Sequence, residues 1–363
     1  MTISTDFEAI AKRHKRRLTL KYVVLSAGLA LVALVLGYMG LNRLTSMNGQ
    51  YLMAYYNNRI QIAYPNIDVN SFFYNANSQF TGELHSERTK DIAGISVPFE
   101  PYRAPYSLPL PREMDYTNEY LVSGDDGRST YTRGTHYKMP RFFNTKAKIT
   151  ESNYDKPTQD LDFIADMSGQ AIEVAITFDK PYLLSDIVKL VPDQLKLNWI
   201  WIGTESSYDT SGLFPANLYG FKPNWKANMT YKEQKQLDKK INDILKKDSE
   251  ADLSKLNAAY DKPVSPTVAL QNSYDTFRHY LQEAADNHWI NSTYGGANGS
   301  HLSEQEDVAL FLKNNRNVKT AKFAGIILTG KAEQFASLKT ADWIYASNIG
   351  QSVAIQPYHQ LTK

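Results

Sequence analysis

The histidines are the side chains best suited to bind a metal or to move a proton near neutral pH. There are seven, and no two have the H-x-x-x-H spacing that places two imidazoles on one face of a helix. His279, Asp286 and His288 are close in sequence, but separations of seven and nine residues need not give them a common face. Ordinary surface positions are the simpler interpretation, so we expect no metal site. The other histidines are His14, His85, His136, His301 and His359.

The motifs of common hydrolases are also missing. The chain has no cysteine, which excludes a thiol nucleophile, a thiolate metal site and a lipoprotein anchor. Neither G-x-S-x-G nor S-x-x-K followed by K-T-G occurs. The stretch YGGANGS (294–300) lacks the lysine of a phosphate loop, and GDDG (124–127) lacks the spaced ligands of a calcium loop. We therefore expect no enzyme, no catalytic residue and no cofactor.

Aromatic side chains could still contact a ligand. The 24 tyrosines and five tryptophans could line a groove for a sugar polymer, or they could be half-buried strand residues. Trp199 and Trp201 alternate in LKLNWIWIG (195–203), so they share one face of a strand. That face is more often core than a binding platform.

The elements that must position these residues begin with an apolar stretch. From Tyr22 to Asn42 the chain has no acidic or basic side chain. About 20 such residues form a helix that crosses a hydrocarbon layer of ~30 Å. The stretch is too long for a removed export signal, and a poor cleavage site follows it. We expect a permanent single-pass anchor in the cell membrane, with Tyr22 and Tyr38 near the two headgroup zones.

Positive charge is concentrated before this stretch, at Lys12, Arg13, Lys15, Arg16, Arg17 and Lys21. Only Arg43 and Arg59 are basic between residues 43 and 62. Basic flanks remain in the cytoplasm, so we expect the N-terminus inside and the C-terminal domain outside the cell. Membrane lipid is the expected partner of the basic cluster. The exported part is nearly neutral, which gives no reason for direct binding to nucleic acid, and its lack of cysteine indicates a bacterium.

Four segments follow from these patterns, and together they predict an α+β fold with a single N-terminal transmembrane helix and an extracytoplasmic mixed-sheet domain. Residues 1–21 form a short basic cytoplasmic segment, and residues 22–42 form the transmembrane helix. Residues 43–112 form a membrane-proximal segment with strands and a proline-rich linker. Prolines between Pro98 and Pro111 exclude a central strand there, so the stretch is extended, either as a linker or as a loop along the edge of a sheet. Residues 113–363 form the extracytoplasmic α+β domain.

Within this last segment the spacing of apolar residues predicts the order of elements. A hairpin turns at residues 124–127. A strand (171–178) is broken at Asp179-Lys180-Pro181-Tyr182 and is followed by a helix (183–190) and a strand (195–203). The same strand–helix–strand order recurs at 323–330, 331–339 and 343–350. The two units could be a weak internal duplication, but we favour two independent strand–helix–strand excursions. Further helices are expected over the charged stretch 230–257, over 268–287 and after Ser303, whose partner Glu306 indicates a capping box.

Three stretches, in the right order along the chain, resemble one family. EVAITFDKPYLLSDIVKLVP followed by LKLNWIWIGT, and FAGIILTGKAEQFASLKTADWIYASNIG, resemble the C-terminal domain of Firmicute sigma factor regulators. FEAIAKRHKRRLTLKYVVLSAGLALVALVLG resembles the start of that family's N-terminal domain. The resemblance implies a membrane-anchored anti-sigma factor or co-regulator. Its cytoplasmic part would hold an extracytoplasmic-function sigma factor, and residues 113–363 would be a sensor-like domain.

If this is so, the cytoplasmic partner meets only residues 1–21. On a helix, Phe7, Ile10, Ala11 and Leu18 form a small apolar stripe. So small a stripe suits weak binding to a sigma factor, or binding that needs a second small membrane protein. The same stripe could instead lie on the inner leaflet and bind only lipid. The alternative function is a cell-surface binding module for a cell-wall polymer, without a signalling role.

Overall fold

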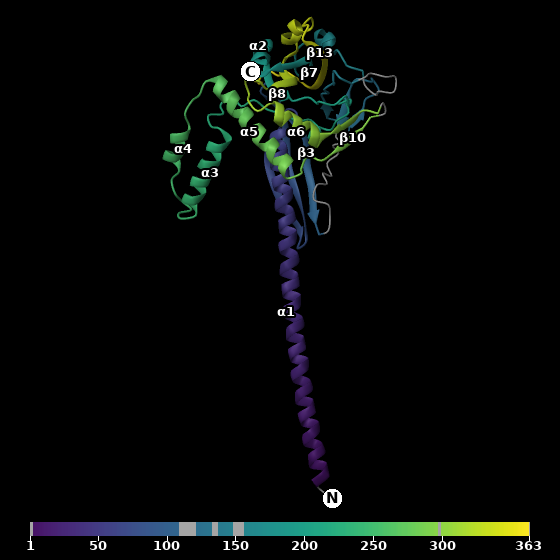
Figure 1. Cartoon of the computed structure of the whole chain (residues 1–363), viewed down its shortest axis with the longest axis vertical. Helices are drawn as coiled ribbons and strands as arrows, with labels where there is room; N and C mark the ends of the chain where they lie inside the picture. Colours follow the sequence, from purple (N-terminus) through teal and green to yellow (C-terminus); the bar gives the residue numbers. More distant parts are fainter. Residues whose placement is uncertain (1–2, 109–120, 133–136, 148–155, 297–298, 363) are drawn as a thin grey trace.

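The computed structural model describes residues 3–108, 121–132, 137–147, 156–296 and 299–362. Its first element is helix α1 (Ile3–Ile62), a long rod that ends inside the folded domain (Figure 1). Within the described part of the chain, α1 is the one helix long and apolar enough to cross a membrane. A domain of helices and antiparallel sheets follows it. The α+β class with an N-terminal apolar helix is therefore confirmed.

Helix α1 does not end where the apolar stretch ends, but continues to Ile62. Along this part Thr45, Gly49, Leu52 and Tyr56 recur every three or four residues, which places them on one face, and all four are buried. Gly49 lies against the ring of Tyr74, which leaves no room for a Cβ at position 49. The membrane helix therefore packs directly on a sheet, and no linker separates the two.

That sheet is antiparallel, in the order β1-β2-β3, with β1 (Ile67–Ser78), β2 (Thr81–Ile92) and β3 (Ile95–Ser107). Side chains of β2 alternate between buried and more exposed positions, because one face of the strand packs inward. Ala93 and Gly94 form the two-residue turn between β2 and β3, with φ of 55° and 92°. Positive φ at both positions is what a tight hairpin turn of this length requires.

The proline-rich stretch is part of this sheet as far as Ser107. Pro98, Pro101 and Pro105 lie in β3, which is an edge strand. An edge strand tolerates proline because one side of its backbone has no partner strand. The expectation that these prolines avoid a central strand is confirmed, whereas their interpretation as a linker is wrong. Pro109 and Pro111 lie outside the described residues.

The predicted hairpin around residues 124–127 is confirmed by a small antiparallel sheet of β4 (Leu121–Ser123), β5 (Thr130–Thr132) and β6 (Lys138–Met139). The Asp126 carboxylate closes the turn by accepting hydrogen bonds from the Ser129 hydroxyl and from the backbone N–H groups of Arg128 and Ser129. These bonds, the hydroxyl bond first, lower the pKa of Asp126 to about 2. Tyr120 and residues 133–136, which include His136, lie outside the described residues.

The largest sheet has the order β13-β7-β12-β8-β9, and all neighbouring strands are antiparallel. Its elements are β7 (Gln170–Leu183), α2 (Leu184–Leu190), β8 (Lys196–Trp201), β9 (Gly220–Phe221), β12 (Lys322–Lys331), η3 (Ala332–Leu338) and β13 (Ile344–Ala354). Strands β7 and β8 flank β12, while β12 and β13 flank β7. The two strand–helix–strand units therefore interlock in one sheet, in a split βαβ arrangement.

The prediction that the strand at 171–178 is broken at Asp179–Tyr182 is wrong. Residues Asp179–Tyr182 stay within β7. They form an irregularity there, because β12 pairs Gly325 with Thr177 and Phe323 with Tyr182. A bulge of this kind accommodates a proline without ending the strand.

Both faces of the large sheet are covered. On one face Trp199 and Trp201 pack against Phe142, with ring centroids 5.7 and 4.9 Å apart from it. On the other face α5 (Pro266–Asp286) places Phe277 5.1 Å from Phe221 of β9. Trp199 and Trp201 are 2% and 3% exposed, so their interpretation as core is confirmed.

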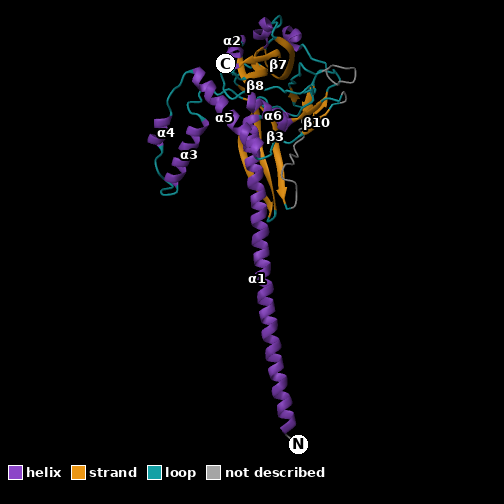
Figure 2. Ribbon diagram, viewed as in Figure 1, coloured by secondary structure: helices purple, strands orange, loops and turns teal. Residues whose placement is uncertain are grey.

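The remaining elements are η1 (Asp160–Met167), η2 (Pro215–Asn217), α3 (Tyr231–Leu245), α4 (Ser254–Tyr260), β10 (Thr293–Gly295), β11 (His301–Ser303) and α6 (Glu304–Asn314). Helices α3 and α4 form an arm that leaves the body of the domain (Figure 2), as expected for the charged stretch. The helices expected at 268–287 and after Ser303 are also present, and the Ser303 hydroxyl accepts from the backbone N–H of Glu306.

Candidate functional site at the joint between α1 and the sheets

One buried arginine fixes the C-terminal end of α1. Arg59 is 4% exposed. Its guanidinium donates to the carbonyl oxygens of Ala216 and Trp289 and to the hydroxyls of Tyr55 and Tyr219, over 2.6–3.1 Å. Three of these partners lie more than 150 residues away in the chain. The end of the membrane helix is therefore held by the C-terminal half of the protein.

Glu304 balances the charge of Arg59 through the Tyr219 hydroxyl. That hydroxyl accepts from Arg59 at 2.7 Å and donates to the Glu304 carboxylate at 2.9 Å. Glu304 begins α6 and is 2% exposed. Burial raises the pKa of Glu304 above its ordinary 4.5, and the nearby charge of Arg59 opposes this shift. The three side chains link α1 to α6 across the interior.

A second buried ion pair joins the membrane-proximal sheet to the large sheet. Lys90 of β2 and Glu173 of β7 approach to 2.7 Å, and their side chains are 1% and 0% exposed. The other oxygen of the Glu173 carboxylate accepts from Asn66 at 2.8 Å. The backbone N–H of Gln351 donates to the first oxygen at 3.1 Å. Glu173 thus has partners from β2, from β13 and from the segment between α1 and β1.

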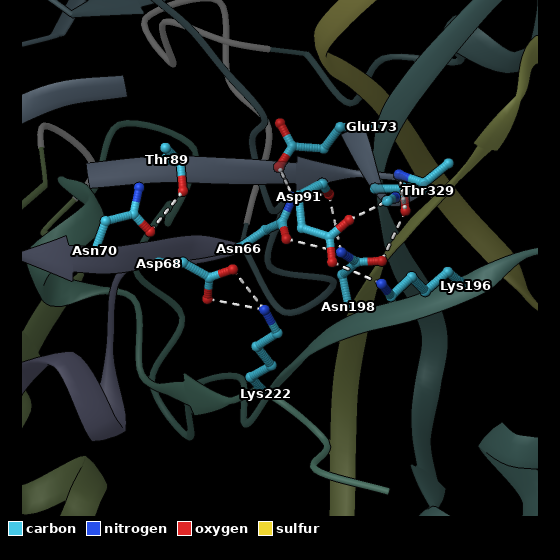
Figure 3. Close-up of polar contacts among 12 residues, drawn as sticks. Asn66, Asp68, Asn70, Thr89, Asp91, Glu173, Lys196, Asn198, Lys222 and Thr329 are labelled. Carbon is cyan, nitrogen blue, oxygen red and sulfur yellow. Dashed lines mark hydrogen bonds and ion pairs between the residues drawn. The ribbon is translucent and has the colours of Figure 1, made fainter. Parts of the chain in front are cut away.

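A line of amides and hydroxyls extends this contact across the large sheet (Figure 3). The Asn198 amide donates to the Asn66 side chain at 2.9 Å, and its oxygen accepts from the Thr329 hydroxyl at 2.7 Å. At the end of β2, Asp91 and Lys196 form a further ion pair at 2.6 Å. Buried polar groups must be paired to be tolerated, and these strands supply partners to one another.

We call Arg59, Tyr219 and Glu304, together with Lys90, Glu173 and Asn66, the joint. Its charged groups are engaged with each other and are shielded from solvent. Such an arrangement holds α1 and β2 in fixed positions on the C-terminal half of the chain. It suits mechanical coupling between two parts of a protein and offers no exposed nucleophile or acid for a reaction.

The apolar stripe expected to bind a partner lies on α1, before the span. Phe7, Ile10 and Leu18 are 77%, 66% and 41% exposed, and Ala11 is exposed as well. At 100° per residue the four positions fall on one side of the helix. No described residue of the folded domain covers them, and their role in partner binding stays a prediction.

The histidine cluster weighed for metal binding is dispersed. His279 stacks on the ring of Tyr231 at 3.7 Å, and His288 follows α5 with a φ of 56°. Across the described ranges, no group of three His, Cys, Asp or Glu side chains is placed to hold a metal ion.

The joint was not foreseen from the sequence, although two of its residues carry a signal. Glu173 is the one charged residue in the apolar run AIEVAITF, and a lone carboxylate in a buried strand needs a partner. Arg59 stands in a helical stripe of large apolar residues. In neither case does the sequence show which residue is the partner, because the partners are far away in the chain.

Two family models match the chain. The model described as sigma factor regulator N-terminal covers residues 8–97. The model described as sigma factor regulator C-terminal covers residues 164–351, just over half of the 363 residues. No curated protein and no solved structure matches the chain. The joint lies where the two matched regions meet, since Arg59 and Lys90 belong to the first region and Glu173 and Glu304 to the second. The resemblance seen in the sequence is confirmed: the chain belongs to the sigma factor regulator family, whose members are regulators and not enzymes.

Proposed function

We propose that this single-pass sigma factor regulator controls an extracytoplasmic-function sigma factor, as an anti-sigma factor or a co-regulator, through a sensor domain that faces outward. The family matches support the regulatory role. The basic residues before the span support a cytoplasmic N-terminus. A sigma factor works inside the cell, so the short basic segment is the part that meets it.

The unbroken course of α1 carries this proposal. One helix of 60 residues runs from the basic segment, through the span, to Arg59 in the joint, and it ends at Ile62. A continuous helix can transmit displacement or rotation along its axis, and rigid helices are among the elements that carry coupling between distant sites. A change in the outer domain that moves the joint therefore moves residues 7–18 as well.

Contact with the sigma factor is assigned to the stripe of Phe7, Ile10, Ala11 and Leu18. Four side chains bury far less than the ~800 Å² per partner of a typical stable interface. Direct binding through the stripe alone is therefore weak, and tight binding needs a second small membrane protein. Insertion of the stripe into the inner leaflet is the competing use of the same residues.

The functional test is genetic. Deletion of the gene should raise transcription of one extracytoplasmic-function sigma regulon, and Phe7→Asp with Ile10→Asp should reproduce that rise. Two carboxylates remove the apolar contact but leave the span unchanged. The single variants Phe7→Asp and Ala9→Asp form the matched pair, because each adds one carboxylate. Phe7→Asp lies in the stripe and should raise transcription, whereas Ala9→Asp lies outside it and should leave transcription at the wild-type level. Reporter fusions to each such regulon measure the effect, with membrane fractionation to confirm insertion.

If transcription of every such regulon is unchanged in the deletion strain, control of an extracytoplasmic-function sigma factor is rejected. The cell-surface binding module then becomes the better hypothesis. If the deletion raises transcription but Phe7→Asp with Ile10→Asp does not, the regulator stands and the stripe is not its contact.

Orientation has its own test. Protease added to intact protoplasts should remove the C-terminal domain while a tag at the N-terminus stays protected, because the basic flank keeps that end in the cytoplasm. Immunoblots against tags at the two ends read the result. Protection of the C-terminal tag would show that the charge argument is wrong.

A further inference from the structure

We propose that the tip of the β1–β2 hairpin is embedded in the headgroup zone of the leaflet next to the folded domain, and that phospholipid is its partner. The tip is defined as residues 73–82. This inference rests on α1 being the membrane span and not on the identity of any sigma factor, so its failure and the failure of the regulatory role are separate results.

A ring contact sets the level of the tip relative to the bilayer. Phe80 packs edge-on against Tyr38 of α1, with centroids 5.9 Å apart. Tyr38 lies four residues before Asn42, the last residue of the charge-free stretch, which is about 6 Å along a helix. The hairpin therefore reaches past the end of that stretch by about one helical turn, alongside the span itself.

The length of the apolar stretch shows whether the hydrocarbon layer could end before Tyr38. If the tip stayed in water, the span would have to end before Tyr38, and residues 23–37 would cover only about 22 Å at ~1.5 Å per residue. A hydrocarbon layer is ~30 Å thick. The full stretch from Tyr22 to Asn42 matches that thickness, and it places Tyr38 and Phe80 together at the interface.

The composition of the tip fits the interface. Residues 71–82 (SFFYNANSQFTG) contain no acidic or basic side chain. Farther from the turn, Phe73 and Tyr74 are 49% and 40% exposed. Aromatic rings with amide and hydroxyl neighbours are typical of the headgroup level of membrane proteins.

Residues of α1 near this level are also apolar and exposed. Leu41, Leu44 and Met47 are 47%, 51% and 55% exposed. They follow the charge-free stretch directly along α1, and the exposed Arg43 among them suits the headgroup zone, where long basic side chains reach the interface. Continuity with a membrane-crossing surface identifies lipid as the occupant. The absence of charge from the tip indicates that the contact does not need anionic lipid.

Strand β2 connects this surface with the joint, because it begins beside the tip at Thr81 and carries Lys90 near its other end. The hairpin is thus a second connection between bilayer and joint, in addition to α1.

The chain has no cysteine, so single labels can be placed cleanly. Gln79→Cys at the exposed tip, Leu34→Cys in the middle of the span and Tyr358→Cys on the far side of the domain (71% and 78% exposed for Leu34 and Tyr358) would each carry a nitroxide spin label. The full chain would be placed in nanodiscs of phosphatidylcholine, with or without phosphatidylglycerol. Collisions of the label with oxygen and with a water-soluble nickel chelate report its depth.

We expect the label at position 79 to lose most of the chelate collisions seen at position 358, and to lie between positions 358 and 34 in depth, in both lipid mixtures. Collision rates at position 79 equal to those at position 358 would overturn the proposal. If the label at position 79 is shielded only in nanodiscs that contain phosphatidylglycerol, the contact needs anionic lipid and the inferred uncharged contact is wrong. Burial seen only in native membranes and not in nanodiscs would assign the tip to a protein partner instead.

Discussion

Replacing Glu173 with alanine should lower the free energy of unfolding by roughly 3–5 kcal/mol, the usual cost of breaking a buried ion pair by removing one partner. The change leaves the Lys90 ammonium, which is 1% exposed, without its counter-charge. It also removes the acceptor of the Asn66 amide and of the Gln351 N–H. Unfolding of the full chain in detergent micelles, followed by tryptophan fluorescence against denaturant, measures the loss.

Two further variants test whether burial is the cause. Asp68→Ala removes one partner of the Asp68–Lys222 pair, which is also short at 2.6 Å but has side chains 34% and 42% exposed. It should cost at most about 1 kcal/mol, because solvent screens such a pair. The double variant Lys90→Met with Glu173→Leu should recover much of the lost stability, since apolar replacements leave no buried charge. A cost for Glu173→Ala no greater than that for Asp68→Ala would contradict the role assigned to the pair.

Replacing Arg59 with methionine should cost a similar amount, roughly 3–5 kcal/mol at neutral pH. Methionine fills part of the same volume but donates no hydrogen bond to Tyr55, Tyr219 or the two carbonyl groups. It leaves Glu304, 2% exposed, as a buried carboxylate without a cation. The same unfolding measurement applies, and the C-terminal end of α1 is the part expected to loosen.

The pH dependence of this variant follows from Glu304. Burial already raises the pKa of Glu304 above 4.5, and Arg59 holds it down, so removal of Arg59 raises that pKa further. A carboxyl group whose pKa is raised by folding contributes stability that is present below its unfolded pKa and is lost as the pH rises through its folded pKa. The cost of Arg59→Met should therefore be smaller near pH 4.5 than near pH 7.5.

A double variant separates this cause from loss of packing. Arg59→Met combined with Glu304→Gln keeps the shape of the glutamate side chain but carries no charge. It should be more stable than Arg59→Met alone at pH 7.5, and its stability should not fall over the window in which Glu304 loses its proton. An Arg59→Met variant whose cost is the same at both pH values would show that the charge of Glu304 is not the cause.

Features that depend on local pattern could be predicted from the sequence. The apolar stretch from Tyr22 to Asn42 is a local property, because helical backbone satisfies its own hydrogen bonds in lipid. Alternation in AIEVAITF and the step of three and four residues in 268–287 likewise follow from the repeat of one strand or one helix. These elements are present in the structure, and so is the turn at residues 124–127, whose bonds are formed within a few residues.

The way in which those elements pack against one another could not be predicted from local pattern. The residue pattern predicted that the membrane helix ends near residue 42. Residues 43–62 combine polar and apolar side chains, and their helical face is recognisable only once the sheet that buries Thr45, Gly49 and Tyr56 is known. The prolines of β3 suggested a linker for the same reason: an edge position depends on strands elsewhere in the chain. The pairs Arg59–Glu304 and Lys90–Glu173 join residues 245 and 83 positions apart. Their partners are selected by burial, which no local spacing encodes. The span and most of the elements thus follow from local pattern, while the joint that ties the span to the folded domain follows from long-range packing.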